Sequence, residues 1–361
     1  MHRAEVVVGV PKFRYTNHHC GHFRPAGARV QGRCPQVAVP SPGRANRVVL
    51  RRIPRSRCGT IAGMEDPRVL TRARLLAAGA SAFEIARELR TGELVPVAHG
   101  VYLRRGDHGA LDGTGRHRVL ARHFGSALDP GEAISHISAA TLHGAPVWNL
   151  PLTRVHVSRT PGAGARQRGR LHIHTARWMD ADLTVVDAVP VTSVARTIAD
   201  VARTVPRPQA VIVGDALLRI DPAAAAWLPR VVEAASGLHG VARARAVAGF
   251  LDARSESVGE SLSRVRIEEA GLPRPVLQHE VVVRDGRRCR LDFFWDEAGV
   301  VGEFDGAGKY SDRRDLVAEK LREDALRDVG FEVIRWNWAE LDRFDVVVQR
   351  FERARARRRR Q

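Results

Sequence analysis

Residues 290–306 read RLDFFWDEAGVVGEFDG, and this stretch decides the expected fold of the C-terminal part of the chain. Two apolar runs flank residues 296–299, DEAG, which have the composition of a tight turn. A β-hairpin is therefore predicted, with Trp295 facing Val300 across the turn. That register fixes which charged side chains of the two strands should meet.

The predicted register brings acidic residues together. Asp292 would lie opposite Glu303, and Arg290 opposite Asp305, with all three acids on one face of the sheet. Like charges that face each other destabilise a sheet, so such an arrangement usually has a cation or a proton to share. Hard divalent ions such as Mg²⁺ take carboxylate oxygens, which favours a metal site. The alternative is an ordinary Arg290–Asp305 ion pair, with Asp292 at an exposed sheet edge.

Lysine is rare in the chain, and two of the lysines follow the acidic strands. Of 58 Lys and Arg residues, only Lys12, Lys309 and Lys320 are lysines. An arginine does not give up its proton near neutral pH, whereas a lysine can have its pKa lowered for proton transfer. Lys309 and Lys320 are therefore candidate catalytic residues.

The formal net charge of +18 is concentrated at the two ends of the chain. Residues 1–63 contribute +11 and residues 353–360 contribute +6, which leaves +1 for residues 64–352. A basic extension over residues 1–63 and a basic tail over residues 351–361 are predicted, both disordered. Because the rest is nearly neutral, any nucleic-acid contact there must come from local patches.

Cysteine usage and hydropathy indicate a reducing compartment. Only Cys289 lies beyond residues 1–63, so no disulfide framework is expected in the folded part. No apolar run reaches the length of a membrane span. A cytoplasmic protein without a membrane partner is therefore predicted. Because Met64 directly precedes the first expected helix, we also hypothesise that translation starts there.

Residues 64–106 have the pattern of a small winged helix-turn-helix domain. Asp66 and Pro67 are typical of a helix start, a Ser81–Glu84 capping box opens a second helix, and two short strands are expected within residues 92–102. The second helix would read DNA. Use for protein contact is the alternative, because glutamates lower the positive charge of the helix face. The candidate DNA-contacting residues are Arg87, Arg90 and Tyr102, and the glutamates are Glu84, Glu88 and Glu93.

The middle of the chain is predicted to be a linker at 107–116, an α+β domain over 112–205 and a helical connector over 206–254. Apolar spacing predicts helices and strands in the α+β domain and one helix at the start of the connector. The helices are expected at 132–143, at 192–203 with Thr192 as the cap, and at 209–219, and the strands at 154–159, 171–176 and 185–191.

Histidines recur in the predicted middle domain. His172 and His174 would share a strand face, and His136 and His143 lie two turns apart on one predicted helix, with His156 between these pairs in the sequence. Metal ligation is one interpretation. No carboxylate or cysteine accompanies them at ligand spacing, so ordinary core or surface histidines are the favoured interpretation.

Residues 255–350 are predicted to form a last domain with the order α-β-β-β-α-β. Ser257 and Glu260 have capping-box spacing, which places Glu260 in the first turn of a helix that runs to Ala270. Capping alone would be the usual role of such a glutamate. The strands are expected at 276–284, around Asp292, around Glu303 and at 331–336, and the second helix at 315–329.

This order, with an acid on the first helix, Asp on the second strand and Glu-x-Asp on the third, resembles the PD-(D/E)XK nuclease superfamily. More narrowly it resembles the DUF559 branch, which is similar to the very-short-patch repair endonucleases. The resemblance covers about residues 255–345, and the N-terminal half resembles actinobacterial proteins with a type IV antitoxin (AbiEi-like) winged-helix domain. The nuclease motifs are 303–306 EFDG, 309–310 KY, 319–324 EKLRED and 330–336 GFEVIRW, and the antitoxin motifs are 92–94 GEL, 99–102 HGVY, 135–140 SHISAA, 142–144 LHG and 191–197 VTSVART.

The resemblance implies hydrolysis of a phosphodiester bond that depends on Mg²⁺ or Mn²⁺. Asp292 and Glu303 match the metal ligands of the superfamily, with Asp305 as a further candidate ligand. Glu260 would orient a metal-bound water or complete the metal's ligand shell. The implied architecture is an α+β multidomain chain, with a winged helix-turn-helix, an α+β middle domain and a restriction-endonuclease-like domain.

The chain departs from the superfamily at the position of the catalytic lysine. Asp305 stands where the lysine belongs, so either Lys320 or Lys309 replaces it, or the nuclease is impaired. Lys320 is favoured because it would project from a helix, whereas Lys309 lies in a loop flanked by glycine.

Two functions follow as hypotheses. The first is a DNA-binding protein with a metal-dependent endonuclease-like domain, in a phage-defence or toxin–antitoxin context. The second is an antitoxin-like transcriptional repressor whose nuclease fold no longer cuts. DNA is the expected partner in both, with a cognate toxin or another protein as a further partner. A purely protein-binding module would leave the acid cluster unexplained.

Overall fold

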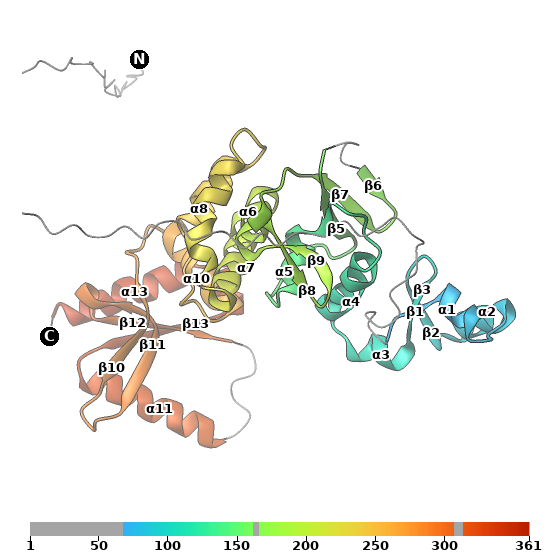
Figure 1. The fold of residues 1–361 in the computed structure, drawn as a ribbon. Coiled ribbons are helices and arrows are strands. Elements are labelled where there is room, and N and C mark those ends of the chain that lie inside the picture. The colour runs from blue at the N-terminus through green and yellow to red at the C-terminus, as the bar shows by residue number, and fades with distance from the viewer. Residues whose placement is uncertain (1–67, 162–165, 307–312, 361) are drawn as a thin grey trace, which may run out of the picture. The chain divides into compact units, whose positions relative to one another are not determined.

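The computed structural model describes residues 68–161, 166–306 and 313–360. Contacts between Cα atoms divide the chain into two units, Met1–Arg57 and Cys58–Gln361, and every described residue belongs to the second unit. This unit mixes helices and strands, with sheets of three, six and four strands (Figure 1). Across the described ranges, no helix is long and apolar enough to cross a membrane.

Some of the predictions fall outside these residues. They are the basic extension over residues 1–63, the start at Met64, the helix cap at Asp66 and the loop that carries Lys309.

The first elements form a short helix pair and a three-stranded sheet with the order β1-β3-β2. Ser81 caps the second helix through the predicted capping box, in which its Oγ accepts from the N–H of Glu84. The first helix starts later than predicted, because Leu70 and Thr71 pair with β3 as a strand and Thr71 provides the cap. The elements are β1 (Leu70–Thr71), α1 (Arg72–Ala77), α2 (Ala82–Thr91), β2 (Leu94–Ala98) and β3 (Val101–Arg104).

The linker predicted at residues 107–116 is wrong. Helix α3 (Arg105–Ala110) and helix α4 (Gly113–Gly125) occupy this segment. The Asp112 side chain accepts from the N–H of Gly115 at 2.6 Å and so caps α4. A capping aspartate followed by buried apolar residues outweighs the local glycine content.

A six-stranded mixed sheet with the order β6-β7-β5-β4-β9-β8 follows. The helix predicted from Glu132 begins only at His136, because residues 132–134 pair with β5 as a strand. The single strand predicted at 185–191 is a hairpin of two strands. The elements are β4 (Glu132–Ile134), α5 (His136–Leu142), β5 (Val155–Arg159), β6 (Arg166–Arg168), β7 (Leu171–Thr175), η1 (Asp180–Asp182), β8 (Leu183–Val186) and β9 (Val189–Thr192).

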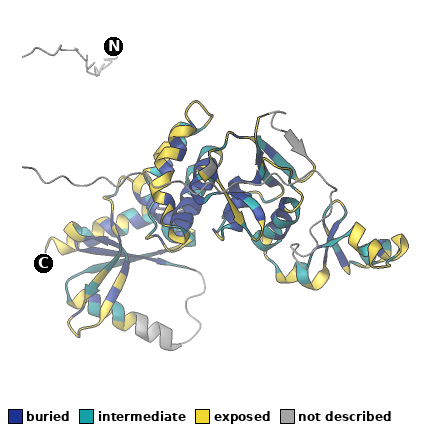
Figure 2. Ribbon diagram, viewed as in Figure 1, coloured by how far each residue is buried: buried dark blue, intermediate teal, exposed yellow. Residues whose placement is uncertain are grey.

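Four helices follow the six-stranded sheet in the sequence, before α10 and the last sheet. Figure 2 shows that α6 and α7 are largely buried, as their apolar sequences require. Ser193 caps α6, whereas Thr192, the predicted cap, bonds through its hydroxyl to that of Thr197 at 2.7 Å. The helices are α6 (Val194–Thr204), α7 (Arg207–Ile220), α8 (Ala224–Ala234) and α9 (Val241–Ala248).

The last part of the chain has the predicted order of elements, followed by two further helices. Its sheet, β10-β11-β12-β13, is antiparallel except for the last pair of strands, and α11 lies on the face opposite α10 and α13 (Figure 1). The elements are α10 (Val258–Glu269), β10 (Val276–Val282), β11 (Arg288–Trp295), η2 (Asp296–Ala298), β12 (Val300–Asp305), α11 (Arg313–Asp328), β13 (Glu332–Asn337), α12 (Trp338–Leu341) and α13 (Asp345–Arg358).

The disordered basic tail predicted over residues 351–361 is wrong for residues 351–358, which form the second half of α13. Phe351 and Ala354 are completely buried, and the Phe351 ring lies 4.9 Å from that of Trp295, between centroids. Apolar residues at helical spacing therefore bind this segment to the sheet, while its arginines face outward.

Candidate functional site

The predicted hairpin is present in the predicted register, with Trp295 paired to Val300. The ladder between β11 and β12 ends at the pair Phe293–Gly302, so Asp292 and the residues of β12 beyond Gly302 lie where the two strands part. Asp292 uses the opening, because its Oδ2 accepts the backbone N–H of Phe304 at 3.1 Å. The carboxylate thus takes a donor that a longer ladder would have paired.

Glu303 is held by arginines. Its side chain is 7% exposed, with Oε1 2.6 Å from Arg322 Nη1 of α11 and Oε2 3.1 Å from Arg335 Nη2 of β13. Arg335 also lies 3.4 Å from Glu323. Two guanidinium groups therefore balance the buried charge of Glu303 on the face covered by α11.

Glu260 approaches the opening from α10. Gly259 lets the helix lie close to β12, since a Cβ there would come within 1.9 Å of the Phe304 ring. Ser257 caps the helix by accepting the Glu260 N–H at 3.1 Å and donates its hydroxyl to Glu260 Oε1 at 2.8 Å. The other oxygen, Oε2, accepts from Gln278 Nε2 at 3.0 Å. This glutamate is held in one place.

Glu260 and Asp292 interact electrostatically. Burial raises the pKa of Glu260, and the negative charge of Asp292 raises it further, against the lowering effect of its hydrogen bonds. The two negative charges repel each other, so a cation or a proton between these carboxylates would stabilise the site.

The predicted ion pair between Arg290 and Asp305 does not form. Arg290 binds Glu256 instead, with Nη1 2.9 Å from Oε1 and Nη2 2.7 Å from Oε2. At this point β11 no longer pairs with β12, so Arg290 does not come opposite Asp305. On its other side β11 still pairs with β10, where Arg290 is opposite Glu280. Asp305 is half-buried on the Glu303 side of β12.

Of the two candidate lysines, the structure describes one. Lys320 is exposed on α11, and Lys309 lies outside the described residues. Among the described residues, Arg322, two residues beyond Lys320, and Arg335 contact Glu303. Sequence reasoning missed these two, because nothing distinguishes them in an arginine-rich chain until β13 is paired with β12.

A hard divalent ion fits part of this site. Across the described segments, no three of the acids bring oxygens within 4.8 Å of one another. Mg²⁺, however, is often bound by one or two carboxylates together with substrate phosphates and water. Asp292 and Glu260 meet that requirement, whereas Glu303 would first have to release an arginine.

The candidate DNA-contacting residues fall into two groups. Arg87 and Arg90 are exposed on α2, and the Arg90 guanidinium lies 6.0 Å from the ring centroid of Phe83, which is 69% exposed. Tyr102 is only 6% exposed and packs with Ile85 as part of the core. Its assignment to the DNA-contacting surface is therefore wrong.

The structure also gathers histidines that the sequence placed only in pairs. One ring nitrogen from each of His136, His156 and His174 lies within 4.8 Å of the others. His143, paired in prediction with His136, instead bonds through Nε2 to the Thr192 carbonyl at 2.7 Å. The available signal was the shared strand face of His172 and His174.

Comparisons with known proteins add relatives without a described activity. No family model matches the chain. Two Mycobacterium tuberculosis proteins, named Uncharacterized protein MT2308 (strain CDC 1551 / Oshkosh) and Uncharacterized protein Rv2248 (strain ATCC 25618 / H37Rv), are each 29% identical over 68% of this chain and 86% of their own length. The crystal structure of the RV2827C protein from Mycobacterium tuberculosis is 17% identical, with a TM-score of 0.33 over 60% of this chain and 83% of that one.

Proposed function

We propose that the chain is a DNA-binding protein whose C-terminal part hydrolyses phosphodiester bonds with a divalent metal ion. The observation that carries this proposal is the hydrogen bond between Glu260 and Gln278, which lies opposite Asp292 in the register of β10 and β11, where β11 and β12 separate. The order of elements from α10 to β13 agrees with the resemblance to the PD-(D/E)XK nucleases.

In the proposed reaction, the acids at the opening bind the metal ion and the arginines bind the phosphate. Mg²⁺ or Mn²⁺ would be held by Asp292 with Glu260, and a bound ion of this kind polarises a phosphate and lowers the pKa of its water. Arg322 and Arg335 carry fixed positive charge next to Glu303, and guanidinium groups bind phosphate in a bidentate manner. These arginines would stabilise the phosphate, the role expected of Lys320.

The order β1-α1-α2-β2-β3 supports DNA binding, because a winged helix-turn-helix has this sequence of elements. Two of the glutamates that lower the positive charge of the second helix are bound by other groups. Glu84 closes the capping box, and Glu88 lies 3.0 Å from Arg104. Arg87 and Arg90 remain exposed on α2 for phosphate contacts.

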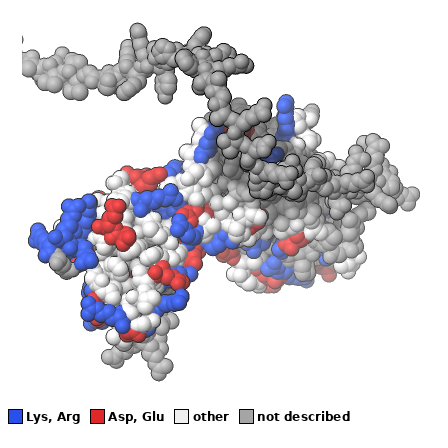
Figure 3. Space-filling view, turned by 60° about the vertical axis from the view of Figure 1, so that its left-hand side comes forward, with Lys and Arg blue, Asp and Glu red and all other residues white. Residues whose placement is uncertain are grey.

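Positive charge on the described residues is local. Over the face seen in Figure 3, basic and acidic side chains lie side by side, without one continuous basic surface. The proposal therefore assigns DNA recognition to patches such as α2. A cytoplasmic location belongs to the same proposal and is supported by the cysteine usage, whereas a role in phage defence or beside a cognate toxin is supported by the resemblance alone.

A repressor of the antitoxin type is the second candidate. The two ion pairs of Glu303 favour it, because a carboxylate already neutralised by arginines has less need of a metal. Asp305 in the lysine position points the same way.

Metal titration and DNA cleavage by the full chain test the proposal. Wild type should bind Mg²⁺ or Mn²⁺ calorimetrically and cut a DNA duplex with Mn²⁺ present. Asp292→Asn should lose both while keeping DNA affinity, and Asp296→Asn, an exposed acid of the same hairpin, should behave as wild type. A wild-type chain that binds DNA but neither binds metal nor cuts, even with metal and DNA together, would instead establish the repressor reading.

A further inference from the structure

Three histidines from three elements meet in the six-stranded sheet, apart from the carboxylates. His156 lies on β5 and His174 on the parallel neighbour β7, while His136 opens α5. His136 is 3% exposed and the other two are half-buried. The rings of His136 and His174 stack with centroids 3.8 Å apart and 17° between their planes.

The spacing of the ring nitrogens suits a metal ion. His156 Nδ1 lies 3.0 Å from His174 Nε2, and a nitrogen of His136 lies within 4.8 Å of both. A zinc–nitrogen bond of about 2.0–2.1 Å places two nitrogens of a tetrahedral site about 3.3 Å apart. The nitrogens therefore lie at the right spacing for one ion, and because the rings of His136 and His174 stack almost parallel, one of these rings must turn about its Cβ–Cγ bond before both lone pairs point at the ion.

The surroundings of His136 resemble the support that metal-binding histidines receive. Its Nδ1 lies 2.9 Å from Ser135 Oγ, which accepts the hydroxyl of Ser158 at 2.7 Å. With Nδ1–H as donor to Ser135, Nε2 is left with a free lone pair, and such second partners fix the tautomer of ligating histidines. His136 also has φ +52°, a strained conformation of the kind that clusters at functional sites.

The protonation state agrees with this geometry. Burial, with the neighbouring imidazoles as a smaller cause, lowers the pKa of all three histidines, to about 2 for His156 and about 4 for His174. They are therefore neutral near pH 7, which is the form that binds metal.

We infer that His136, His156 and His174 bind one borderline transition-metal ion, such as Zn²⁺. Imidazole suits Zn²⁺, Co²⁺ and Ni²⁺, whereas Mg²⁺ prefers oxygen ligands. His156 and His174 line a cleft of about 560 Å³, so an ion bound by three histidines would keep a fourth position open to that cleft.

Three arginines line the cleft, and two of them, Arg203 and Arg243, are engaged by other groups, while Arg154 is the third. Arg203 Nη1 lies 3.2 Å from Asp200 Oδ1, and its Nε donates to the His239 carbonyl. Arg243 Nε donates to the carbonyl of Ala202. These contacts offset part of their charge, and an anionic fourth ligand from the cleft would be favoured.

Titration of the metal-stripped full chain without a histidine tag, in excess Mg²⁺, tests the inference. Co²⁺ should bind wild type with the visible absorption of a low-coordinate cobalt site, and Zn²⁺ should displace it. His156→Asn and His174→Asn should each lose one equivalent of bound Co²⁺ or weaken it at least about tenfold. His239→Asn, an exposed histidine of the same cleft, should bind as wild type.

Wild type that binds no Co²⁺, or variants that bind it as well as wild type, would overturn the inference. Residues 1–63 contain other histidines and cysteines, so the comparison between variants decides and not the total count. If a variant fails to fold, peptide mapping of imidazole modification on wild type replaces it. Zn²⁺ should protect His156 and His174 but not His239, and equal modification with and without Zn²⁺ would contradict the site.

Discussion

The Nη1 of Arg322 lies 2.6 Å from Oε1 of Glu303, so a guanidinium stands next to this buried acid. An arginine keeps its proton near neutral pH and cannot act as a general base. Glu260 on α10 is an acid whose pKa is raised, by burial and then by the negative charge of Asp292. If the site is catalytic, Arg322 contributes charge, and proton transfer falls to Glu260.

Arg322→Gln should destabilise the protein, because buried Glu303 would lose one of the arginines that contact it within the described residues. The Arg322 side chain is 26% exposed, so solvent screens part of the interaction, and a loss of about 1–2 kcal/mol in the free energy of unfolding is expected. Arg327→Gln removes a more exposed ion pair with Glu323 on the same helix and should cost under about 0.5 kcal/mol. Denaturant unfolding measures both, and equal midpoints for the two variants would contradict the assigned role of Arg322.

Local sequence rules predicted the register of the hairpin but not the ion-pair partners of its charged side chains. The turn at residues 296–299 and the apolar alternation were sufficient to set the pair Trp295–Val300, because both act over a few residues. The partners of Glu303 and Arg290 come from α11, β13 and the segment before α10. Such contacts depend on how distant elements pack, which hairpin register does not determine.

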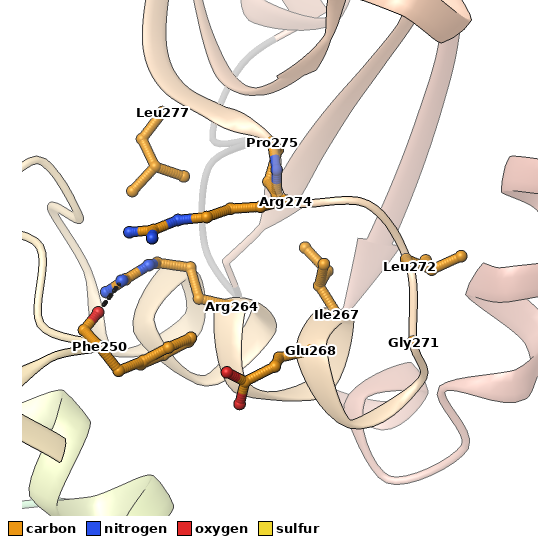
Figure 4. Close-up of a pocket in the computed structure, with 9 residues that line it drawn as sticks. All are labelled: Phe250, Arg264, Ile267, Glu268, Gly271, Leu272, Arg274, Pro275 and Leu277. Atoms are coloured by element: carbon orange, nitrogen blue, oxygen red, sulfur yellow. Dashed lines mark hydrogen bonds between the residues drawn. The ribbon is translucent and has the colours of Figure 1, made fainter. Parts of the chain in front are cut away.

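A buried ion pair joins α7 to α10. Asp215 Oδ2 lies 2.5 Å from Arg264 Nη1 and accepts the Ser261 hydroxyl at 2.9 Å. Figure 4 shows Arg264 donating also to the carbonyl of Phe250, beside a small hollow. Burial raises the pKa of Asp215, whereas the charge of Arg264 and the hydrogen bonds to Asp215 lower it. The charged form of Asp215 therefore depends on these hydrogen bonds.

Asp215→Ala should therefore cost about 3–5 kcal/mol, because it leaves the charge of Arg264 buried without its carboxylate. Arg254→Ala, which removes a pair that is 56% exposed on the arginine side, should change stability by under about 1 kcal/mol. Thermal unfolding of both variants provides the measurement. An Asp215→Ala protein that melts with wild type would show that the two helices do not depend on this pair.

Removal of residues 351–361 should destabilise the C-terminal part strongly. Phe351 is completely buried, and truncating a buried Phe to Ala alone costs about 3–5 kcal/mol. Removal of residues 359–361 only, which leaves Phe351 and Ala354 in place, should have little effect. Soluble yield and melting temperature separate the two truncations, and equal behaviour would mean that α13 is dispensable.

The tail and the histidines show why prediction stopped where it did. The prediction of a disordered tail gave more weight to the six arginines within residues 353–360 than to Phe351 and Ala354, two apolar residues at helical spacing. For the histidines, the strand face of His172 and His174 could be read from alternation. The contact with His136 required the pairing of β5 with β7 and the start of α5, which no local pattern specifies.

Acid should destabilise the metal-free protein through the histidine cluster. An unfolded histidine titrates near pH 6.5, whereas the folded pKa is about 4 for His174 and about 2 for His156. Between about pH 6.5 and pH 4 the unfolded chain therefore binds more protons, so stability is complete above pH 6.5 and falls as the pH is lowered.

A histidine that is protonated only in the unfolded chain changes the free energy of unfolding by about 1.4 kcal/mol per pH unit. Partial exposure reduces this slope, so the free energy of unfolding should fall by about 1–2 kcal/mol from pH 6.5 to 5.5. Denaturant unfolding in chelator at a series of pH values measures the slope. Replacing His156 and His174 together by Asn should flatten it, since those protons are no longer taken up. His239→Asn, at an exposed position, should leave it unchanged. If the double variant kept the wild-type slope, the acid sensitivity would have to come from other groups, and the two rings would not be held neutral by burial.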